Sequence, residues 1–172
     1  MRVLGIDPGS TTMGWGVVEG SGLKYSLCDF GTVKPGSSET FSQRLHKVYQ
    51  GTWEMIQRFK PDVISIEDAF FSVNVRSAMK LGMVRGVLLL LAEQNSIPIA
   101  EYAPRLVKQT IVGHGNAEKH QVGEMVRVLL RMKDAPKPHD AADALAIAIC
   151  HFHHAGIRNR IDLAELKSVR KL

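Results

Sequence analysis

The sequence predicts an α/β domain built on a mixed five-stranded sheet, in which three antiparallel strands are followed by parallel strands and helices flank the sheet. Two observations support this fold class. The first 33 residues hold apolar runs separated by glycine-containing turns, and the rest alternates helix-length segments with short strand-like runs. A chain of 172 residues, 45% of them hydrophobic, can bury a core without disulfides. We expect one domain over residues 1–158 and a charged C-terminal tail over 159–172.

The chain opens with three expected strands. Val3, Leu4 and Ile6 have the apolar character of a buried strand, and the turn residues Pro8 and Gly9 end it, so that Asp7 lies at the end of a strand. A second strand is expected over 12–18 and a third over 23–33. The short connections between them predict an antiparallel meander.

Helices and strands alternate in the rest of the chain. Ser38 is the expected cap of a helix over 39–59, with a core face formed by Phe41, Leu45, Val48, Trp53 and Ile56. Asn74 is the expected cap of a helix over 75–94, whose second half is apolar on nearly all sides and suits burial in the core or against another subunit. The remaining expected elements are strands over 63–67 and 97–102, a short helix from Pro104, and helices over 117–132 and from His139.

The charge is unevenly distributed along the chain. The net charge is +5, and residues 70–172 carry 15 Lys and Arg against 9 Asp and Glu, whereas residues 1–69 carry 7 against 8. With a pI near 9.4, the basic part indicates a polyanionic partner such as nucleic acid. A basic surface that serves only solubility is the alternative.

Nothing in the sequence indicates a membrane or an oxidising compartment. Cys28 and Cys150 have no metal-binding or disulfide spacing, and the longest apolar run, over 87–92, is too short to cross a bilayer. We therefore expect a soluble, cytoplasmic protein.

Four acidic residues stand at places that suit a catalytic site. Asp7 and Glu67 end strands, and Asp140 and Asp143 share one face of a helix start. As a set of oxygen ligands they suit Mg²⁺, with Mn²⁺ as a substitute, and two such ions would serve phosphodiester hydrolysis. The alternative is structural: Asp7 would cap a turn, and the helix acids would cap the helix and favour its dipole.

Two further features remain open from the residues alone. Phe70 and Phe71 follow Glu67 in a loop, where adjacent aromatic rings either pack into the core or are exposed for bases to stack on. Lys119 lies in the first turn of its expected helix, which is unfavourable for the helix dipole unless an anion is bound nearby.

The chain resembles the RuvC family of bacterial Holliday-junction resolvases from residue 1 to about 155. The stretches that carry the resemblance are 4–10, Ile66-Glu67, 80–82, 108–110 with Gly113 and Gly115, 117–119 with Gln121 and Val122, and 140–146. Each motif alone is weak, but six in the same order are highly specific.

The resemblance implies an RNase H-like fold and a homodimer that cuts two opposed strands of a four-way DNA junction. It further implies Mg²⁺ at Asp7, Glu67, Asp140 and Asp143, phosphate contacts by Lys108 and Lys119, and base contact by Phe70. The implied partners are junction DNA and the branch-migration proteins RuvA and RuvB. The apolar helix over 81–91 is the expected dimer interface. Some relatives carry His at the metal position of the last helix, so His139 competes with Asp140 for that role, as Phe71 does with Phe70 for the bases.

Three other functions remain as hypotheses. The segment 7–12 resembles the phosphate-binding hairpin of the sugar kinase, Hsp70 and actin group, although 172 residues are too few for the two lobes of that group. An RNA-processing nuclease of the same fold would share the carboxylates. A scaffold that binds junctions without cutting them would not need the carboxylates to converge.

Overall fold

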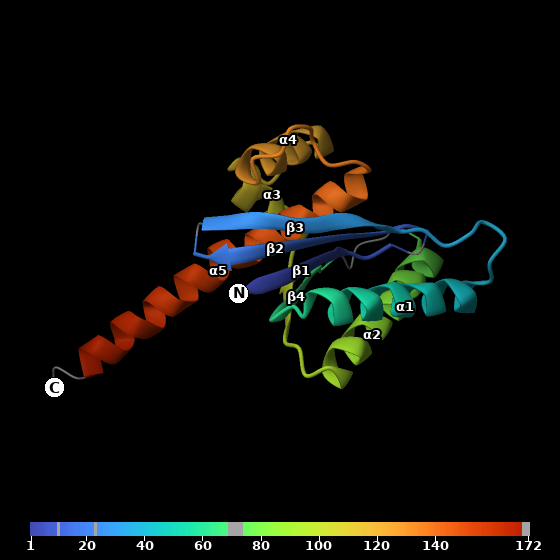
Figure 1. The fold of residues 1–172 in the computed structure, drawn as a ribbon, viewed down its shortest axis with the longest axis horizontal. Helices are drawn as coiled ribbons and strands as arrows, with labels where there is room; N and C mark the ends of the chain where they lie inside the picture. The colour runs from blue at the N-terminus through green and yellow to red at the C-terminus, as the bar shows by residue number, and fades with distance from the viewer. Residues whose placement is uncertain (10, 23, 69–73, 170–172) are drawn as a thin grey trace.

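The core of the protein is a five-stranded mixed sheet with the strand order β3-β2-β1-β4-β5 (Figure 1). The computed structural model describes residues 1–9, 11–22, 24–68 and 74–169, the last of these by backbone alone from residue 156. The strands are β1 (Arg2–Asp7), β2 (Met13–Ser21), β3 (Lys24–Val33), β4 (Val63–Glu67) and β5 (Ile99–Tyr102). Strand β2 pairs antiparallel with both β1 and β3, whereas β1, β4 and β5 run parallel. The predicted fold class is confirmed.

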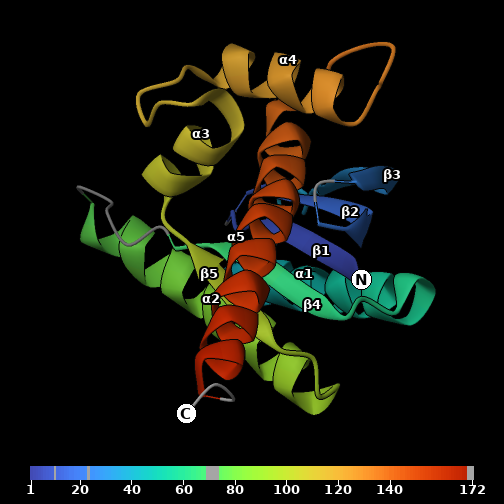
Figure 2. The same ribbon diagram turned by 90° about the vertical axis from the view of Figure 1, so that its left-hand side faces the viewer.

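Helices cover both faces of this sheet, as the two ribbon views show (Figure 2). Helices α1 (Phe41–Phe59) and α2 (Val75–Gln94) lie on one face. Helix α5 (His139–Val169) crosses the other face, and α3 (Pro104–Val112) and α4 (Lys119–Leu129) pack beside its first half. Each strand therefore directs alternate side chains toward α5 or toward the α1–α2 layer.

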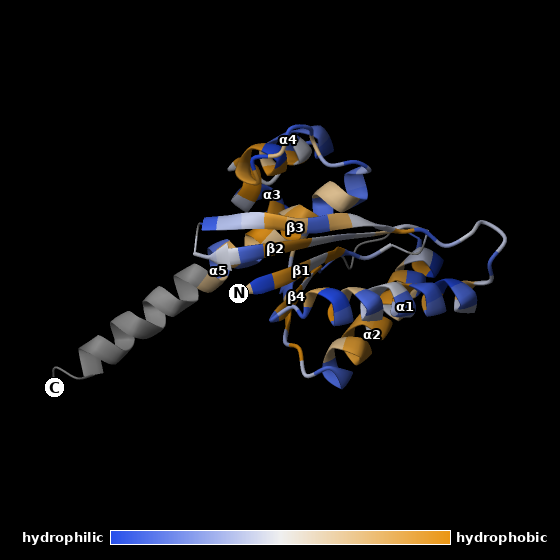
Figure 3. Cartoon of the chain, viewed as in Figure 1, coloured by the Kyte–Doolittle hydropathy of each residue, from blue (hydrophilic) through white to orange (hydrophobic). Residues whose placement is uncertain are grey.

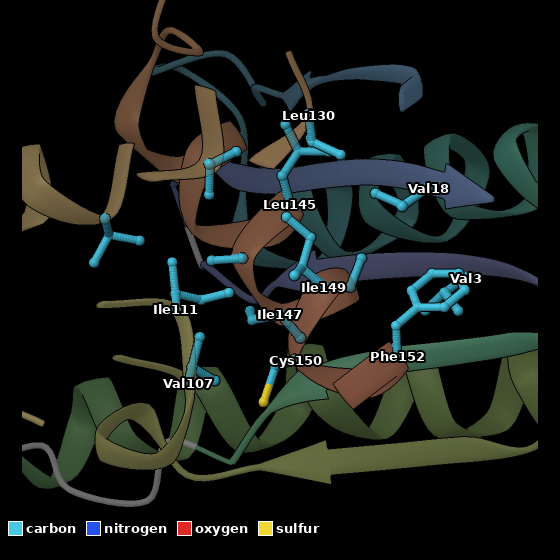
Figure 4. Close-up of a cluster of buried hydrophobic side chains, with 14 of the residues drawn as sticks. Val3, Val18, Val107, Ile111, Leu130, Leu145, Ile147, Ile149, Cys150 and Phe152 are labelled. Carbon is cyan, nitrogen blue, oxygen red and sulfur yellow. The ribbon is translucent and has the colours of Figure 1, made fainter. Parts of the chain in front are cut away.

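Two buried clusters fill the spaces between the three layers. On the α5 face, Val3 and Val18 pack with Leu145, Ile149 and residues of α3 and α4 (Figure 4). The other cluster joins the opposite sides of β1 and β4 to α1 and α2; its members include Leu4, Ile6, Ile64, Val48 and Leu88. Figure 3 shows hydrophobic stretches in β1, β2 and the first part of α5, and these elements contribute residues to the two clusters.

Helix α1 begins and packs differently from the prediction. Its N-cap is Thr40 and not Ser38, because Thr40 forms a capping box in which its backbone N–H donates to Gln43 Oε1 at 2.8 Å. The buried positions of the helix are Val48, Thr52, Met55 and Ile56. Trp53, predicted on the core face, is 46% exposed, since it lies one position beyond the buried Thr52.

Helix α5 continues well beyond the globular body of the protein. Its second half extends away from the sheet (Figure 1), and its backbone is helical through Val169. The charged tail predicted from residue 159 is thus continuous with this helix. Within the described ranges, no helix has both the length and the apolar character needed to cross a membrane.

Candidate active site

Asp7 and Glu67 lie at the same ends of two neighbouring parallel strands. The register pairs Ile6 of β1 with Ile66 of β4, so the next residue of each strand is an acid. Ile6 and Ile66 belong to the cluster under α1 and α2, and alternation along a strand therefore turns Asp7 and Glu67 toward α5. Two carboxylates predicted from separate strands are thus brought side by side on one face.

Small residues of the sheet allow α5 to approach these two acids. A methyl group added at Gly5 would overlap the carbonyl oxygen of Ala144, and one at Gly14 would overlap that of Asp140. The backbone of α5 therefore rests directly on β1 and β2. The hydroxyl of the buried Ser65 donates a hydrogen bond to the carbonyl oxygen of Ile147 at 3.1 Å, which ties β4 to the same helix. These contacts fix the first turns of α5 above the strand ends.

Asp143 of α5 completes a group of three acids around one cavity. The cavity has a volume of about 230 Å³ and is lined by Asp7, Glu67, Pro104, Val107, Lys108, Lys119, Val122, Asp143 and Ile147. The carboxylates come from β1, β4 and α5, and the two lysines come from α3 and α4. Five of the predicted site residues therefore line the same cavity.

Asp140 lies one turn before Asp143 and is not among the residues that line this cavity. It is close enough to raise the pKa values of Asp7 and Asp143 by charge repulsion. His139 is exposed and lowers the pKa of Asp143 through its charge. Phe70 and Phe71 lie outside the described residues.

The acids of the cavity are difficult to ionise in the metal-free protein. Burial raises the pKa of Asp7 to about 8, and repulsion by Glu67, Asp143 and Asp140 adds to this effect. Burial is also the largest cause of the raised pKa values of Glu67 and Asp143. A carboxylate that is this difficult to ionise indicates a site made to receive positive charge.

Two lysines supply part of that charge. Lys119 Nζ lies 3.4 Å from Asp143 Oδ2, and Asp143 is the main cause of the raised pKa of Lys119. This carboxylate is the anion that the first-turn position of Lys119 required. Lys108 lowers the pKa of Glu67 by its charge.

The donor set fits a divalent cation in chemistry. Asp7, Glu67 and Asp143 offer only oxygen ligands, as Mg²⁺ and Mn²⁺ prefer, and burial raises the pKa of each carboxyl group. As the side chains stand, no three His, Cys, Asp or Glu residues in the described part of the chain converge to hold an ion together. Binding therefore requires side-chain adjustment, and Asp143 is engaged by Lys119.

Several residues that build this site could not be identified from any pattern in the sequence. Ser65 and Ile147 are connected only in three dimensions, and the walls of the cavity include the apolar Val107 and Val122. Behind the site, Arg85 of α2 bridges Asp68 at 3.2 Å and Glu101, and so ties α2 to the ends of β4 and β5. An arginine in a helix of mixed character carries no pattern that would indicate such a bridge.

Three histidines of α5 have partners outside the cavity, namely His151, His153 and His154. Tyr102 Oη and His151 Nδ1 are 2.9 Å apart, and Tyr25 Oη and His153 Nε2 are 3.3 Å apart. Thr110 Oγ1 lies 3.3 Å from His154 Nε2. These contacts connect α5 to β5, β3 and α3.

Known protein sequences match this chain over nearly its whole length. A family model described as crossover junction endodeoxyribonuclease RuvC matches residues 3–151. A crossover junction endodeoxyribonuclease RuvC from Chloroflexus aggregans is 46% identical over 164 residues, which cover 95% of this chain and 100% of the relative. One from Dehalococcoides mccartyi is 40% identical over 166 residues, covering 96% and 99% of the two chains.

Solved structures of two Holliday-junction proteins have a similar fold. The RuvC of T. thermophilus, solved in complex with a Holliday junction substrate, matches with a TM-score of 0.86 and 39% identity, covering 91% of this chain and 96% of that one. The yeast mitochondrial Holliday junction resolvase Ydc2 matches with a TM-score of 0.67 over 95% of this chain and 85% of that one. At 15% identity, the yeast enzyme is similar in fold alone.

Proposed function

The chain belongs to the RuvC family of crossover junction endodeoxyribonucleases, and we propose that it resolves four-way DNA junctions by metal-dependent hydrolysis of phosphodiester bonds. The observation that carries this proposal is the meeting of Asp7, Glu67 and Asp143 from three separate elements at one cavity, with Lys108 and Lys119 beside them. A scaffold that only binds junctions would have no use for buried acids whose ionisation is unfavourable. Residues 1–158 would form the nuclease domain, and 159–172 a tail.

In this proposal, the three carboxylates hold Mg²⁺, with Mn²⁺ as a substitute, and Asp140 adds negative charge from the neighbouring turn. Two bound ions would supply water activation and stabilisation of the leaving oxygen. The chain's own residues fix the geometry, because β1, β4 and α5 are locked together by backbone contact and by the Ser65 hydrogen bond. Rigid elements hold catalytic groups more accurately than loops do.

Lys108 and Lys119 are the proposed contacts to the scissile strand. Both line the cavity, and an ammonium group there attracts a phosphate while it offsets the charge of the carboxylates. Phe70, with Phe71 as the alternative, is the proposed contact to bases. The excess of basic residues over 70–172, which include Lys108 and Lys119, suits binding to DNA.

A homodimer would place two such sites on one junction. Helix α2 exposes large apolar side chains: Val75, Met79, Met83, Leu89 and Leu90 are 72%, 58%, 47%, 37% and 57% exposed. Exposed apolar residues gathered on one helix are typical of an interface between subunits. Two equivalent sites related by a two-fold axis would cut two equivalent strands. We extend the proposal to RuvA and RuvB as partners and to the cytoplasm as the location.

A cleavage assay tests the proposed function. The protein is incubated with an end-labelled synthetic four-way DNA junction, with and without Mg²⁺, and a linear duplex and a structured RNA serve as control substrates. We expect paired symmetric nicks on the junction alone, only with the metal. Asp7→Asn should abolish cleavage but not junction binding, whereas the matched variant Asp134→Asn, at an exposed position outside the cavity, should cut normally. Tight junction binding without cleavage under Mg²⁺ or Mn²⁺ would support a scaffold instead.

A further inference from the structure

We propose that Lys119 and the divalent cation compete for Asp143, so that Lys119 is the counter-charge of the metal-free site and is released toward the DNA backbone when the metal binds. This inference rests on the proposed function, because it concerns the same carboxylates. It assigns Lys119 two successive partners in place of a single phosphate contact. The consequence is a coupling between metal binding and DNA binding through one side chain.

The geometry of the ion pair supports an exchange of partners. Lys119 Nζ is 3.4 Å from Asp143 Oδ2, a distance that permits attraction without a tight hydrogen bond. The side chain of Lys119 is 64% exposed, whereas that of Asp143 is 24% exposed. The lysine can therefore swing into solvent at little cost, while the carboxylate stays in the cavity.

The backbone of Lys119 is anchored although its side chain is free to move. Lys119 is the first residue of α4, and the preceding Glu118 donates its backbone N–H to Gln121 Oε1 at 2.8 Å. The helix itself packs against α5 through the buried Val122 and Val126. Movement of the ammonium group is thus limited to the flexible four-carbon side chain.

The charges in the cavity explain why a divalent cation would displace Lys119 from Asp143. Asp7, Glu67 and Asp143 offer three carboxyl groups to a cation, and of the two lysines at the cavity only Lys119 forms an ion pair with Asp143. A divalent ion brings twice the charge and can contact several carboxylate oxygens at once. Once it binds, Lys119 faces a cation instead of a free carboxylate and is repelled. The lack of three converging acidic side chains in the described residues is consistent with Asp143 being engaged by the lysine.

The exchange predicts a reciprocal effect between the two ligands. Metal binding releases Lys119 for a phosphate, and a phosphate that attracts Lys119 frees Asp143 for the metal. By thermodynamic linkage, each ligand must then raise the affinity of the other by the same factor through this route. Removal of the ammonium group should tighten metal binding to the free protein and weaken the coupling.

Calorimetric titration of the DNA-free protein with Mn²⁺ tests the competition. We expect Lys119→Met to bind Mn²⁺ about fivefold more tightly than wild type, the size expected for loss of a partly exposed ion pair. Lys108→Met is the matched control: Lys108 lines the same cavity, but no ion pair joins it to Asp143. Equal tightening in both variants would indicate general electrostatics and would overturn the exchange, as would unchanged or weaker binding by Lys119→Met.

A second readout follows the lysine directly. Acetylation of surface amines, quantified by mass spectrometry, should modify Lys119 faster with saturating Mn²⁺ than without it. Lys47, which pairs with Glu39 away from the cavity, should react at the same rate in both conditions. A Lys119 rate that does not respond to Mn²⁺ would contradict the release.

The outcomes separate this inference from the proposed function. If wild type binds Mn²⁺ and cuts junctions but Lys119→Met binds with unchanged affinity, only the exchange is wrong. If neither wild type nor Lys119→Met binds Mn²⁺, the proposed metal site is itself wrong.

Discussion

The carboxyl group of Asp7 is buried at the end of β1, and its pKa is raised from 3.8 to about 8. Between these two values the folded protein retains a proton that the unfolded chain has released. The stability of the metal-free protein should therefore decrease as the pH rises from about 4 to about 8. The raised pKa values of Glu67 and Asp143 act in the same direction.

Asp7→Asn should remove the largest part of this pH dependence. In a chelating buffer at pH 8, we expect the variant to melt about 3 °C above wild type, which is roughly 1 kcal/mol for a chain of this size. At pH 5 the difference should shrink, because Asp7 of wild type is then neutral. Differential scanning calorimetry from pH 5 to 8 measures both values. Identical pH slopes in the two proteins would contradict the burial of an ionisable Asp7.

The individual site residues differ in how far the sequence could assign them. Asp7 and Glu67 were predictable because each ends an apolar strand, and ligand sites of α/β sheets gather beyond the carboxyl ends of their strands. The acids at the start of α5 were predictable as a pair, but the choice between His139 and Asp140 beside Asp143 depends on how the helix is rotated over the sheet. The spacing of residues along the sequence does not determine this rotation of the helix. It is set by contact of the α5 backbone with Gly5 and Gly14.

The contact between α5 and the sheet is therefore the element that positions Asp143. We predict that Gly14→Ala destabilises the protein by about 1–3 kcal/mol, the usual range for overpacking, because the methyl group would overlap the Asp140 carbonyl oxygen. The same variant should lose more cleavage activity than its stability loss explains, since the first turn of α5 must move. Urea unfolding and cleavage rates at low temperature measure the two effects.

Gly123→Ala is the matched control for this substitution. A methyl group at Gly123 of α4 would make an ordinary contact with Ala142 Cβ at 3.9 Å, and alanine favours a helix over glycine. We expect this control to be as stable as wild type or more so. If Gly14→Ala were equally harmless, the close approach of α5 would not determine the site.

The kinds and the order of the elements could be predicted, whereas several of their boundaries could not. The helix expected from 39 begins at Phe41, because the capping box of Thr40 and Gln43 determines its start. The strand expected from 97 begins at Ile99, and the helix expected from 117 begins at Lys119. The start of an element depends on which of several polar residues forms a hydrogen bond with a free backbone group. By contrast, Asn74 caps α2 as predicted, accepting hydrogen bonds from Arg76 and Ser77.

For the whole molecule, the proposed homodimer makes the apolar face of α2 essential for paired cuts. Met79, Met83 and Leu90 recur at helical spacing and are each about half exposed or more. We predict that Met83→Glu yields a folded monomer that no longer makes paired cuts. Light scattering with size-exclusion chromatography measures the mass, and circular dichroism checks the fold.

Val128→Glu is the control for this charge insertion. Val128 is also an exposed apolar residue, 56% exposed, but it lies on α4. The control should keep the mass of wild type. A monomeric wild type, or a Met83→Glu variant with the mass of wild type, would remove α2 as the interface.

The most direct test of the proposed active site is to locate the metal. Crystals of the protein soaked in Mn²⁺ should show anomalous scattering peaks in the cavity, with oxygens of Asp7, Glu67 and Asp143 within about 2.3 Å of the ions. Such a result would place the proposed cofactor on the acids that β1, β4 and α5 bring together. If protein that cuts junctions with Mn²⁺ showed no ion at these carboxylates, or an ion bound elsewhere, the proposed active site would be wrong.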